Sequence, residues 1–161
     1  TRGARAHFDL GHTKEAEDWN LRGLARFPDH NNLIMMRFNH LAAQGRYEDA
    51  LAYAEATIPS LNGEDRTKLV VNRCTLLLSQ RRTEAAYAEL SRIADRELSF
   101  EGLVLRAELH ARLRRFDESD KDLAAARAAA QRSGKPQQAA QVERATERLR
   151  AFREEVERKK R

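Results

Sequence analysis

The sequence predicts an all-α fold made of repeated helical hairpins, and three observations lead to this prediction. The 161 residues include only 7 Gly and 3 Pro and are rich in Ala, Leu, Arg and Glu, the composition of helices. Apolar residues recur at spacings of three and four, as on one face of a helix. A similar turn sequence recurs about every 34 residues, as the 34 positions between Gly11 and Gly45 illustrate.

The composition also excludes several classes of protein. An all-β fold would need more turn residues and more Val, Ile and Thr. Hydrophobic residues make up 41% of the chain, too many and too regular for a disordered one. No apolar run approaches the roughly 18 residues of a membrane span. The net charge of +5 is mild and its charges are interleaved, which indicates solvated helix faces and not a phosphate-binding stripe.

Four turn sequences mark the repeat. They begin at Gly11, Gly45, Arg81 and Arg114. Each continues with Thr, Tyr or Phe, then with residues that often include an acid, then with a small residue. The acids suit the positive N-terminal end of a following helix, and the two glycines suit the left-handed conformation that ends the preceding one.

The segments before these turns carry matching apolar stripes. The stripes are Ile34, Phe38 and Leu41; Val70, Cys74 and Leu77; and Leu103, Ala107 and His110. An arginine precedes the second member of each stripe, namely Arg37, Arg73 and Arg106. Spacings of four and three predict one amphipathic helix for each segment.

We expect nine helices. They run near 1–10, 13–26, 31–44, 47–58, 65–80, 83–96, 100–113, 116–132 and 136–159. The longest interruption is the linker 59–64. The first helix is short for a complete repeat, so we expect the chain to be a segment of a larger protein.

This pattern resembles the tetratricopeptide repeat (TPR) family over roughly residues 1–132. The matching residues are Gly11, Gly45, Tyr47, Phe116, Ala16, Ala50, Ala86 and Pro28, in addition to the period. The resemblance implies a right-handed α-solenoid of about four helical hairpins, with units 1–28, 29–62, 63–98 and 99–132. Arginine replaces the turn glycine at Arg81 and Arg114, and other helical repeat families of similar period would give a similar pattern.

Residues 133–161 form a different element, which we interpret as a C-terminal capping helix. Gly134 is suited to end the preceding helix, and Pro136 is suited to the first turn of the next one. The apolar seam that follows is Val142, Ala145, Leu149, Phe152 and Val156. A solenoid needs such a helix, apolar on one side and charged on the other, to cover its terminal face. A coiled-coil or partner-binding helix and a nucleic-acid-binding tail ending in 158–161 are the alternatives.

No catalytic motif is present, so we expect no enzyme activity, no cofactor and no metal. The chain has neither a Gly-rich phosphate loop nor a His-Glu-x-x-His zinc helix, and Cys74 is its only cysteine. His110 lies on an apolar stripe, where we expect a packed, hydrogen-bonded histidine. Cys74 occupies the small-residue position of its helix and should be buried and inert. Trp19 and Phe27 should pack in the core or between repeats.

A partner would bind along the first helix of each unit, which lines the concave side of such arrays. We expect the groove to be lined by the residues opposite the apolar stripes: Arg5, Asn32, Met35, Met36, Asn39, Lys68, Asn72, Thr75, Glu101, Leu105 and Glu108. Asn side chains can bond the backbone of an extended peptide, and Met provides adaptable apolar contact. We place the centre of the contact at Met35, Met36, Asn39 and Asn72.

Chaperone-tail binding is disfavoured by the same positions. Family members with that function clamp carboxylates with two Asn, two Lys and an Arg. Asn39 and Asn72 match the two asparagines, but the cationic positions fall on Met35, Glu101 and Leu105. Such a set cannot hold a dicarboxylate, and low-micromolar binding of a peptide ending in Glu-Glu-Val-Asp would refute this conclusion.

The sequence therefore predicts a non-catalytic protein–protein interaction module, a scaffold or adaptor for a peptide or protein partner. A regulatory or docking domain of a larger enzyme, sensor or secretion assembly is the first alternative, and nucleic-acid binding the second, although we expect no nucleic acid. The cytoplasm is favoured over the periplasm because the chain shows no targeting segment. The high Ala and Arg content is typical of a GC-rich bacterial genome. The oligomeric state is open.

Overall fold

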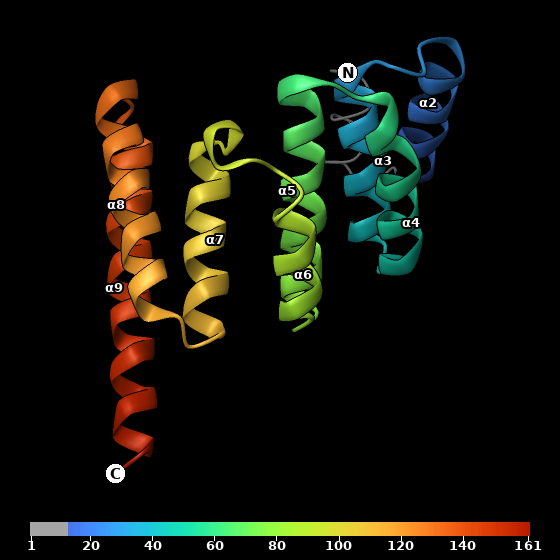
Figure 1. The fold of residues 1–161 in the computed structure, drawn as a ribbon. Helices are drawn as coiled ribbons and strands as arrows, with labels where there is room; N and C mark the ends of the chain where they lie inside the picture. The colour runs from blue at the N-terminus through green and yellow to red at the C-terminus, as the bar shows by residue number, and fades with distance from the viewer. Residues whose placement is uncertain (1–12) are drawn as a thin grey trace. The chain divides into compact units, whose positions relative to one another are not determined.

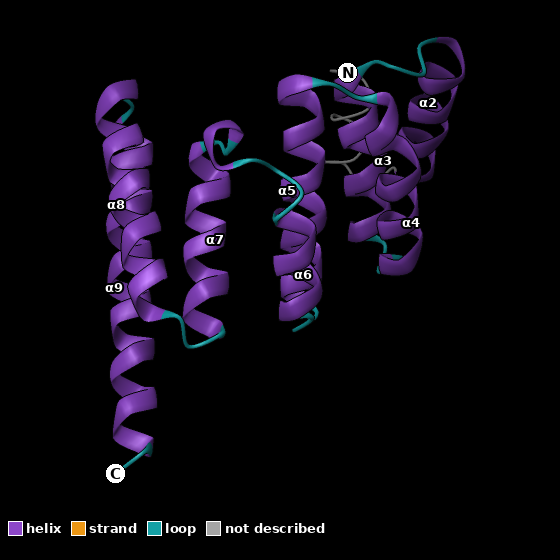
Figure 2. Cartoon of the chain, viewed as in Figure 1, coloured by secondary structure: helices purple, strands orange, loops and turns teal. Residues whose placement is uncertain are grey.

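A computed structural model describes residues 13–161, which form helices joined by short turns (Figures 1 and 2). The helices are α2 (Thr13–Arg26), α3 (Asn31–Ala43), α4 (Tyr47–Thr57), η1 (Ile58–Ser60), α5 (Gly63–Ser79), α6 (Thr83–Leu90), η2 (Asp95–Glu97), α7 (Phe100–Arg112), α8 (Phe116–Ser133) and α9 (Pro136–Lys159). The predicted helix at 1–10 and the turn at Gly11 lie outside the described residues. The all-α prediction is confirmed for the described part of the chain.

The chain divides into two compact units at Leu76 and Leu77, within α5. In the first unit α2 packs on α3, and α3 packs on α4. In the second unit α7 packs on α6, α8 and α9, and α8 also packs on α9. Each unit thus consists of antiparallel hairpins of neighbouring helices, as the repeat predicted.

Three of the predicted turns have the same backbone geometry although their residues differ. Gly45 has a φ of +74°, Arg81 one of +61° and Arg114 one of +64°. Each donates its backbone N–H to the carbonyl three residues earlier, and the next residue donates to the carbonyl five residues earlier. These two backbone hydrogen bonds cap the C-terminal ends of α3, α5 and α7. The repeat therefore keeps its turn even where arginine replaces glycine.

Arg81→Gly should raise the free energy of unfolding by about 1 kcal/mol, because a non-glycine residue is strained in the left-handed region. Gly45→Arg should lower it by a similar amount. Thermal unfolding of the two variants measures both effects. The control is Arg82→Gly, next in the chain at a φ of −89°, which should bring no gain. An equal gain at Arg82 would mean that left-handed strain is not the cause.

Small residues follow the turns and are buried, as the repeat requires. Ala16, Ala50 and Ala86 are completely buried where the second helix of each hairpin begins. Ser119 takes this place in α8, and its hydroxyl donates to the Ala107 carbonyl at 2.7 Å. A larger side chain at these positions would separate the paired helices.

The predicted helix 83–96 is too long, because α6 ends at Leu90. The Ser91 hydroxyl donates to the Tyr87 carbonyl, and the backbone N–H of Ile93 donates to Leu90 instead of continuing the α-helical pattern. The chain then becomes extended at Ala94 and forms η2. Ile93 is still buried, which explains why the apolar spacing resembled a longer helix.

The linker 59–64 also contains structure. Pro59 lies in η1, Leu61 is buried, and α5 begins at Gly63, two residues before the predicted start. The linker is therefore a short, packed connection.

The last helix packs as its seam predicted. Val142, Ala145, Leu149 and Val156 are buried, and Phe152 is half-buried. The first three join a core with residues of α7 and α8, and Phe152 packs against it. Gly134, with a φ of +66°, ends α8, and Pro136 begins α9.

The expectation that Trp19 and Phe27 pack in the core or between repeats is wrong about the core, because both side chains are exposed. Trp19 is 41% exposed and Phe27 is 53% exposed. The buried position of this turn of α2 is taken by Asn20, whose side-chain N–H donates to the Leu33 carbonyl at 2.9 Å. Because adjacent helix residues point about 100° apart, burying Asn20 turns Trp19 outward.

Candidate interaction surface

The predicted groove residues of α3 differ in exposure. Asn32 and Asn39 are exposed, whereas Met35 and Met36 are half-buried. Spacings of three and four place all four on one side of α3, away from the buried Ile34 and Phe38 stripe. We call this set, together with Lys68, Asn72 and Thr75 of α5, the α3–α5 face.

On α5, Lys68 and Thr75 are exposed and Asn72 is half-buried. The Asn72 amide donates to the Met35 sulfur at 3.2 Å, so two of the four predicted central residues touch. Lys68 forms an ion pair with Glu64 at 3.3 Å on its own helix. The structure thus brings the α3 and α5 parts of the predicted groove together in the first unit.

The predicted groove residues of α7 differ in exposure, and Arg5 lies outside the described residues. Glu101 is exposed, and Glu108 is half-buried in ion pairs with Arg112 and Arg148. Leu105 was predicted to face solvent, but it is buried at 8% exposure. Three helices pack against α7, so this helix is buried on more than one side. Its solvent-exposed face is therefore smaller than that of α3.

Ion pairs that hold helices together involve the arginines noted before each apolar stripe. Arg37 forms an ion pair with Glu17 of α2 at 2.6 Å. Arg73 forms one with Glu55 of α4 at 3.5 Å and also donates a hydrogen bond to the Leu51 carbonyl at 3.3 Å. The sequence marked these arginines by register but did not reveal their partners. A carboxylate on the neighbouring second helix is the signal that could have found the pair in α2.

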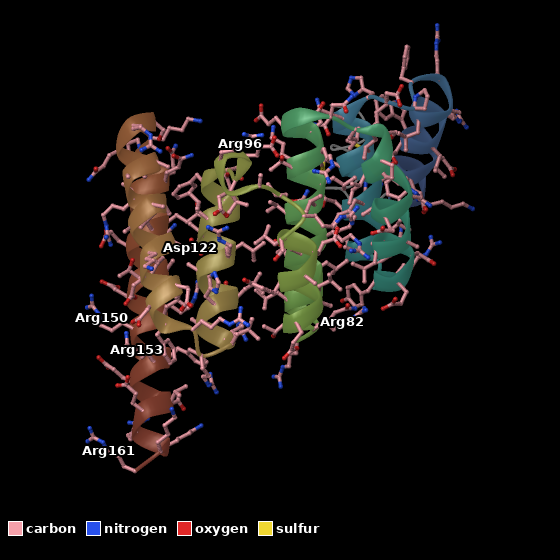
Figure 3. All side chains as sticks on the ribbon, in the orientation of Figure 1. Arg82, Arg96, Asp122, Arg150, Arg153 and Arg161 are labelled. Atoms are coloured by element: carbon pink, nitrogen blue, oxygen red, sulfur yellow. The ribbon has the colours of Figure 1, made fainter. Side chains whose placement is uncertain are left out.

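The third arginine, Arg106, is part of a buried cluster. Its guanidinium donates two hydrogen bonds to Asp122 of α8, at 2.9 and 2.8 Å, and also bonds Asp95. Asp122 is labelled in Figure 3. His110 Nε2 lies 3.4 Å from Asp122, and its ring meets Tyr87 edge-on at 5.3 Å. The expectation of a packed, partnered His110 is therefore confirmed. This cluster links α7 to α8 and is internal.

Stability should fall as the pH drops below 6.5, because two buried histidines resist protonation. Burial lowers the pKa of His40 and of His110 below 6.5, although Glu17 and Asp122 partly oppose this. The unfolded chain then binds protons more readily than the folded one, so stability is full above 6.5 and declines below it. Urea unfolding at about pH 7.5 and about pH 5.5 tests the sign. The His40→Gln with His110→Gln variant should show a flatter pH dependence, and an unchanged slope would contradict this origin.

A second surface was missed by sequence reasoning. The C-terminal half of α2, the turn after it and the start of α3 surround an open hollow of about 610 Å³, which we call the α2 hollow. Its apolar wall comes from Trp19, Phe27 and Leu33, and its charged wall from Arg22 and Arg26, with His30 beside them. The i, i+4 spacing of the two arginines was the available signal.

Two structural features are absent from residues 13–161. No group of three or more His, Cys, Asp or Glu there is placed to hold a metal ion. In that same range, no helix is both long and apolar enough to cross a bilayer.

Comparison with known proteins identifies the fold. No family model matches the chain. Over 91 residues, 55% of the chain, it is 36% identical to "DnaJ homolog subfamily C member 7 homolog" of Schizosaccharomyces pombe, but spans only 19% of that protein. A solved tetratricopeptide repeat protein of Parabacteroides merdae superposes with a TM-score of 0.67 at 18% identity, covering 98% of this chain and 61% of that one. The resemblance inferred from the sequence is thus confirmed, and the chain has the all-helical repeat fold of tetratricopeptide repeat proteins.

Proposed function

We propose that this chain is a non-catalytic protein-interaction module that binds an extended peptide or a partner protein on the α3–α5 face. The observation that best supports the proposal is the contact between Asn72 and Met35, from two different helices. It joins an amide of α5 to a thioether of α3 within the first unit. Similarity to a tetratricopeptide repeat protein is consistent with this role.

The chemistry of the α3–α5 face suits a peptide backbone better than a charged ligand. Asn39 is exposed and Asn72 half-buried, and each amide can both donate and accept hydrogen bonds. The methionines Met35 and Met36 add deformable apolar contact between these amides. Lys68 is the only cation of the α3–α5 face, and it forms an ion pair with Glu64. We therefore expect little selection between charged and uncharged peptides.

Asn39→Ala with Asn72→Ala should weaken binding of a partner by roughly tenfold, because two backbone-directed hydrogen bonds are lost. The partner is first identified with a photo-crosslinking residue at Met36, which should capture it more efficiently than the same residue at exposed Arg144. Its affinity is then measured by calorimetry.

The matched control is Asn62→Ala with Gln137→Ala, which removes two exposed amides elsewhere. It should leave the affinity unchanged. If both double variants bind equally well, or if crosslinking is equal at Met36 and Arg144, the α3–α5 face is not the binding site.

The relative from Schizosaccharomyces pombe favours one second candidate function, a docking domain within a longer protein. The region similar to this chain makes up only 19% of that relative, so there it accompanies other sequence. Binding assays with and without the sequence that flanks this chain in its source protein would separate the two candidates. A partner that binds only the longer protein would favour the docking domain.

A further inference from the structure

Two exposed aromatic side chains form part of the wall of the α2 hollow. Trp19 is 41% exposed and Phe27 is 53% exposed, and both line the same hollow. Scattered exposed apolar residues are normal, but large aromatics grouped around one hollow are typical of a contact surface. The volume of about 610 Å³ lies within the range of pockets that hold ligands.

The charges around the hollow have one sign. Arg22 and Arg26 are one helical turn apart on α2, and neither forms an ion pair with a described residue. The Arg26 guanidinium lies 5.5 Å from the centroid of the Phe27 ring, which holds it beside the apolar wall. Within the part of the chain that the structure describes, no carboxylate lines the hollow. The arginines of α3 and α5 differ, because Arg37 and Arg73 are paired with acids.

We propose that the α2 hollow binds an acidic peptide segment of a partner protein, one that carries an aromatic or branched aliphatic residue between carboxylates. The apolar residue would lie against Trp19 and Phe27, while Arg22 and Arg26 bond the flanking carboxylates. Arginine recognises carboxylates with paired hydrogen bonds, and Trp and Arg are the residues most enriched at the energetic centres of interfaces. Among residues 13–161, no predicted groove residue lines the α2 hollow, so this site is additional to the α3–α5 face.

A peptide fits these observations better than a nucleic acid. Binding of single strands without sequence preference needs a basic groove that follows several phosphates. Here the two arginines form one local pair on a single helix and do not extend into such a groove. The third wall residue, Leu33, has no stacking surface for a base.

Trp19 is the only tryptophan of the chain, so its fluorescence reports on this site alone. The probe is the synthetic peptide Asp-Asp-Glu-Phe-Leu-Asp-Glu, titrated into the full chain. It should shift the Trp19 emission to the blue with micromolar affinity, and the affinity should fall as salt is added. Two control peptides, one with amides for all carboxylates and one with Ala for Phe and Leu, should bind at least roughly tenfold more weakly.

Arg22→Glu with Arg26→Glu should also lower the affinity for the probe peptide at least roughly tenfold, and this variant keeps the fluorescent reporter Trp19. The matched control, Arg158→Glu with Arg161→Glu, makes the same change in net charge at the C-terminal end of α9 and should bind as the parent does. Phe27→Ala gives a second, uncharged variant, and its circular dichroism verifies that α2 is intact.

Four results would overturn the proposal. They are the absence of an emission shift, equal weakening by the two arginine variants, a shift with oligo(dT) but not with the acidic peptide, and a shift that depends only on protein concentration. The third would indicate a nucleic-acid surface, and the fourth self-association through Trp19.

Discussion

Val142→Asp with Leu149→Asp should lower the free energy of unfolding of the second unit by roughly 5 kcal/mol. Both side chains are buried in the core that α9 shares with α7 and α8. Each substitution removes an apolar side chain from this core and places a charge there. The two charges together should release α9 from the hairpin of α7 and α8.

Two arginine–aromatic contacts flank this core and would be lost with it. The Arg114 guanidinium lies 4.9 Å from the Phe152 ring centroid, and the Arg153 guanidinium lies 5.1 Å from that of Phe116. The first joins α9 to the turn before α8, and the second joins α9 to the first residue of α8. Their loss makes detachment of α9 cooperative, so the effect should exceed that of either substitution alone.

The matched control is Ala140→Asp with Ala151→Asp, which puts the same charges on the exposed side of α9. Its cost should be about 1 kcal/mol, the lower helix propensity of Asp. Amide hydrogen exchange is the suitable readout, because the two units need not unfold together. Equal exchange protection of α9 in both double variants would refute its role as a cap and favour the coiled-coil alternative.

The sequence predicted most helix boundaries because the repeat supplies the same signals several times. The predictions 13–26 and 136–159 coincide with α2 and α9, and 116–132 differs from α8 by one residue. A turn residue in the left-handed region, an acid and a buried small residue recur at the three turns before α4, α6 and α8, so several signals together marked each of these boundaries. At α6 no such signal marked the end, since Leu90 and Ile93 kept the helical spacing.

The candidate sites were harder to predict, because exposure depends on which neighbouring helices cover a position. Asn20 and Trp19 are adjacent, and the apolar one would be expected inside, yet the hydrogen bond to the Leu33 carbonyl lets Asn20 be buried. Leu105 was assigned to a wet face by periodicity, but the number of helices against α7 cannot be read from α7 alone. Met35 and Asn72 lie in contact because their repeats share one register, and their role in binding a partner stays a prediction.

Asp122→Ala should lower the free energy of unfolding by about 3 kcal/mol, because it removes a buried carboxylate and leaves the half-buried Arg106 guanidinium without its main partner. Asp122 accepts two hydrogen bonds from Arg106 and lies 3.4 Å from His110. The other partner of Arg106, Asp95, is largely exposed and compensates little. Urea unfolding at neutral pH measures the loss.

The control is Glu143→Ala, which removes the acid of an exposed pair between α8 and α9, 3.1 Å from Arg127. It should cost at most about 0.5 kcal/mol, although its ion pair has nearly the same length. The comparison therefore separates the effect of burial on the unfolding free energy from the effect of ion-pair distance.

A second substitution separates the unpaired charge from lost packing. Adding Arg106→Met to Asp122→Ala removes the charge and keeps an unbranched apolar chain, so it should restore much of the lost stability. The pKa of His110 provides an independent readout, since the Asp122 charge raises it against the effect of burial. In Asp122→Ala, an NMR titration should find the pKa of His110 lower still. A double variant no more stable than Asp122→Ala, with an unchanged His110 pKa, would mean that the carboxylate acts only by filling space between α7 and α8.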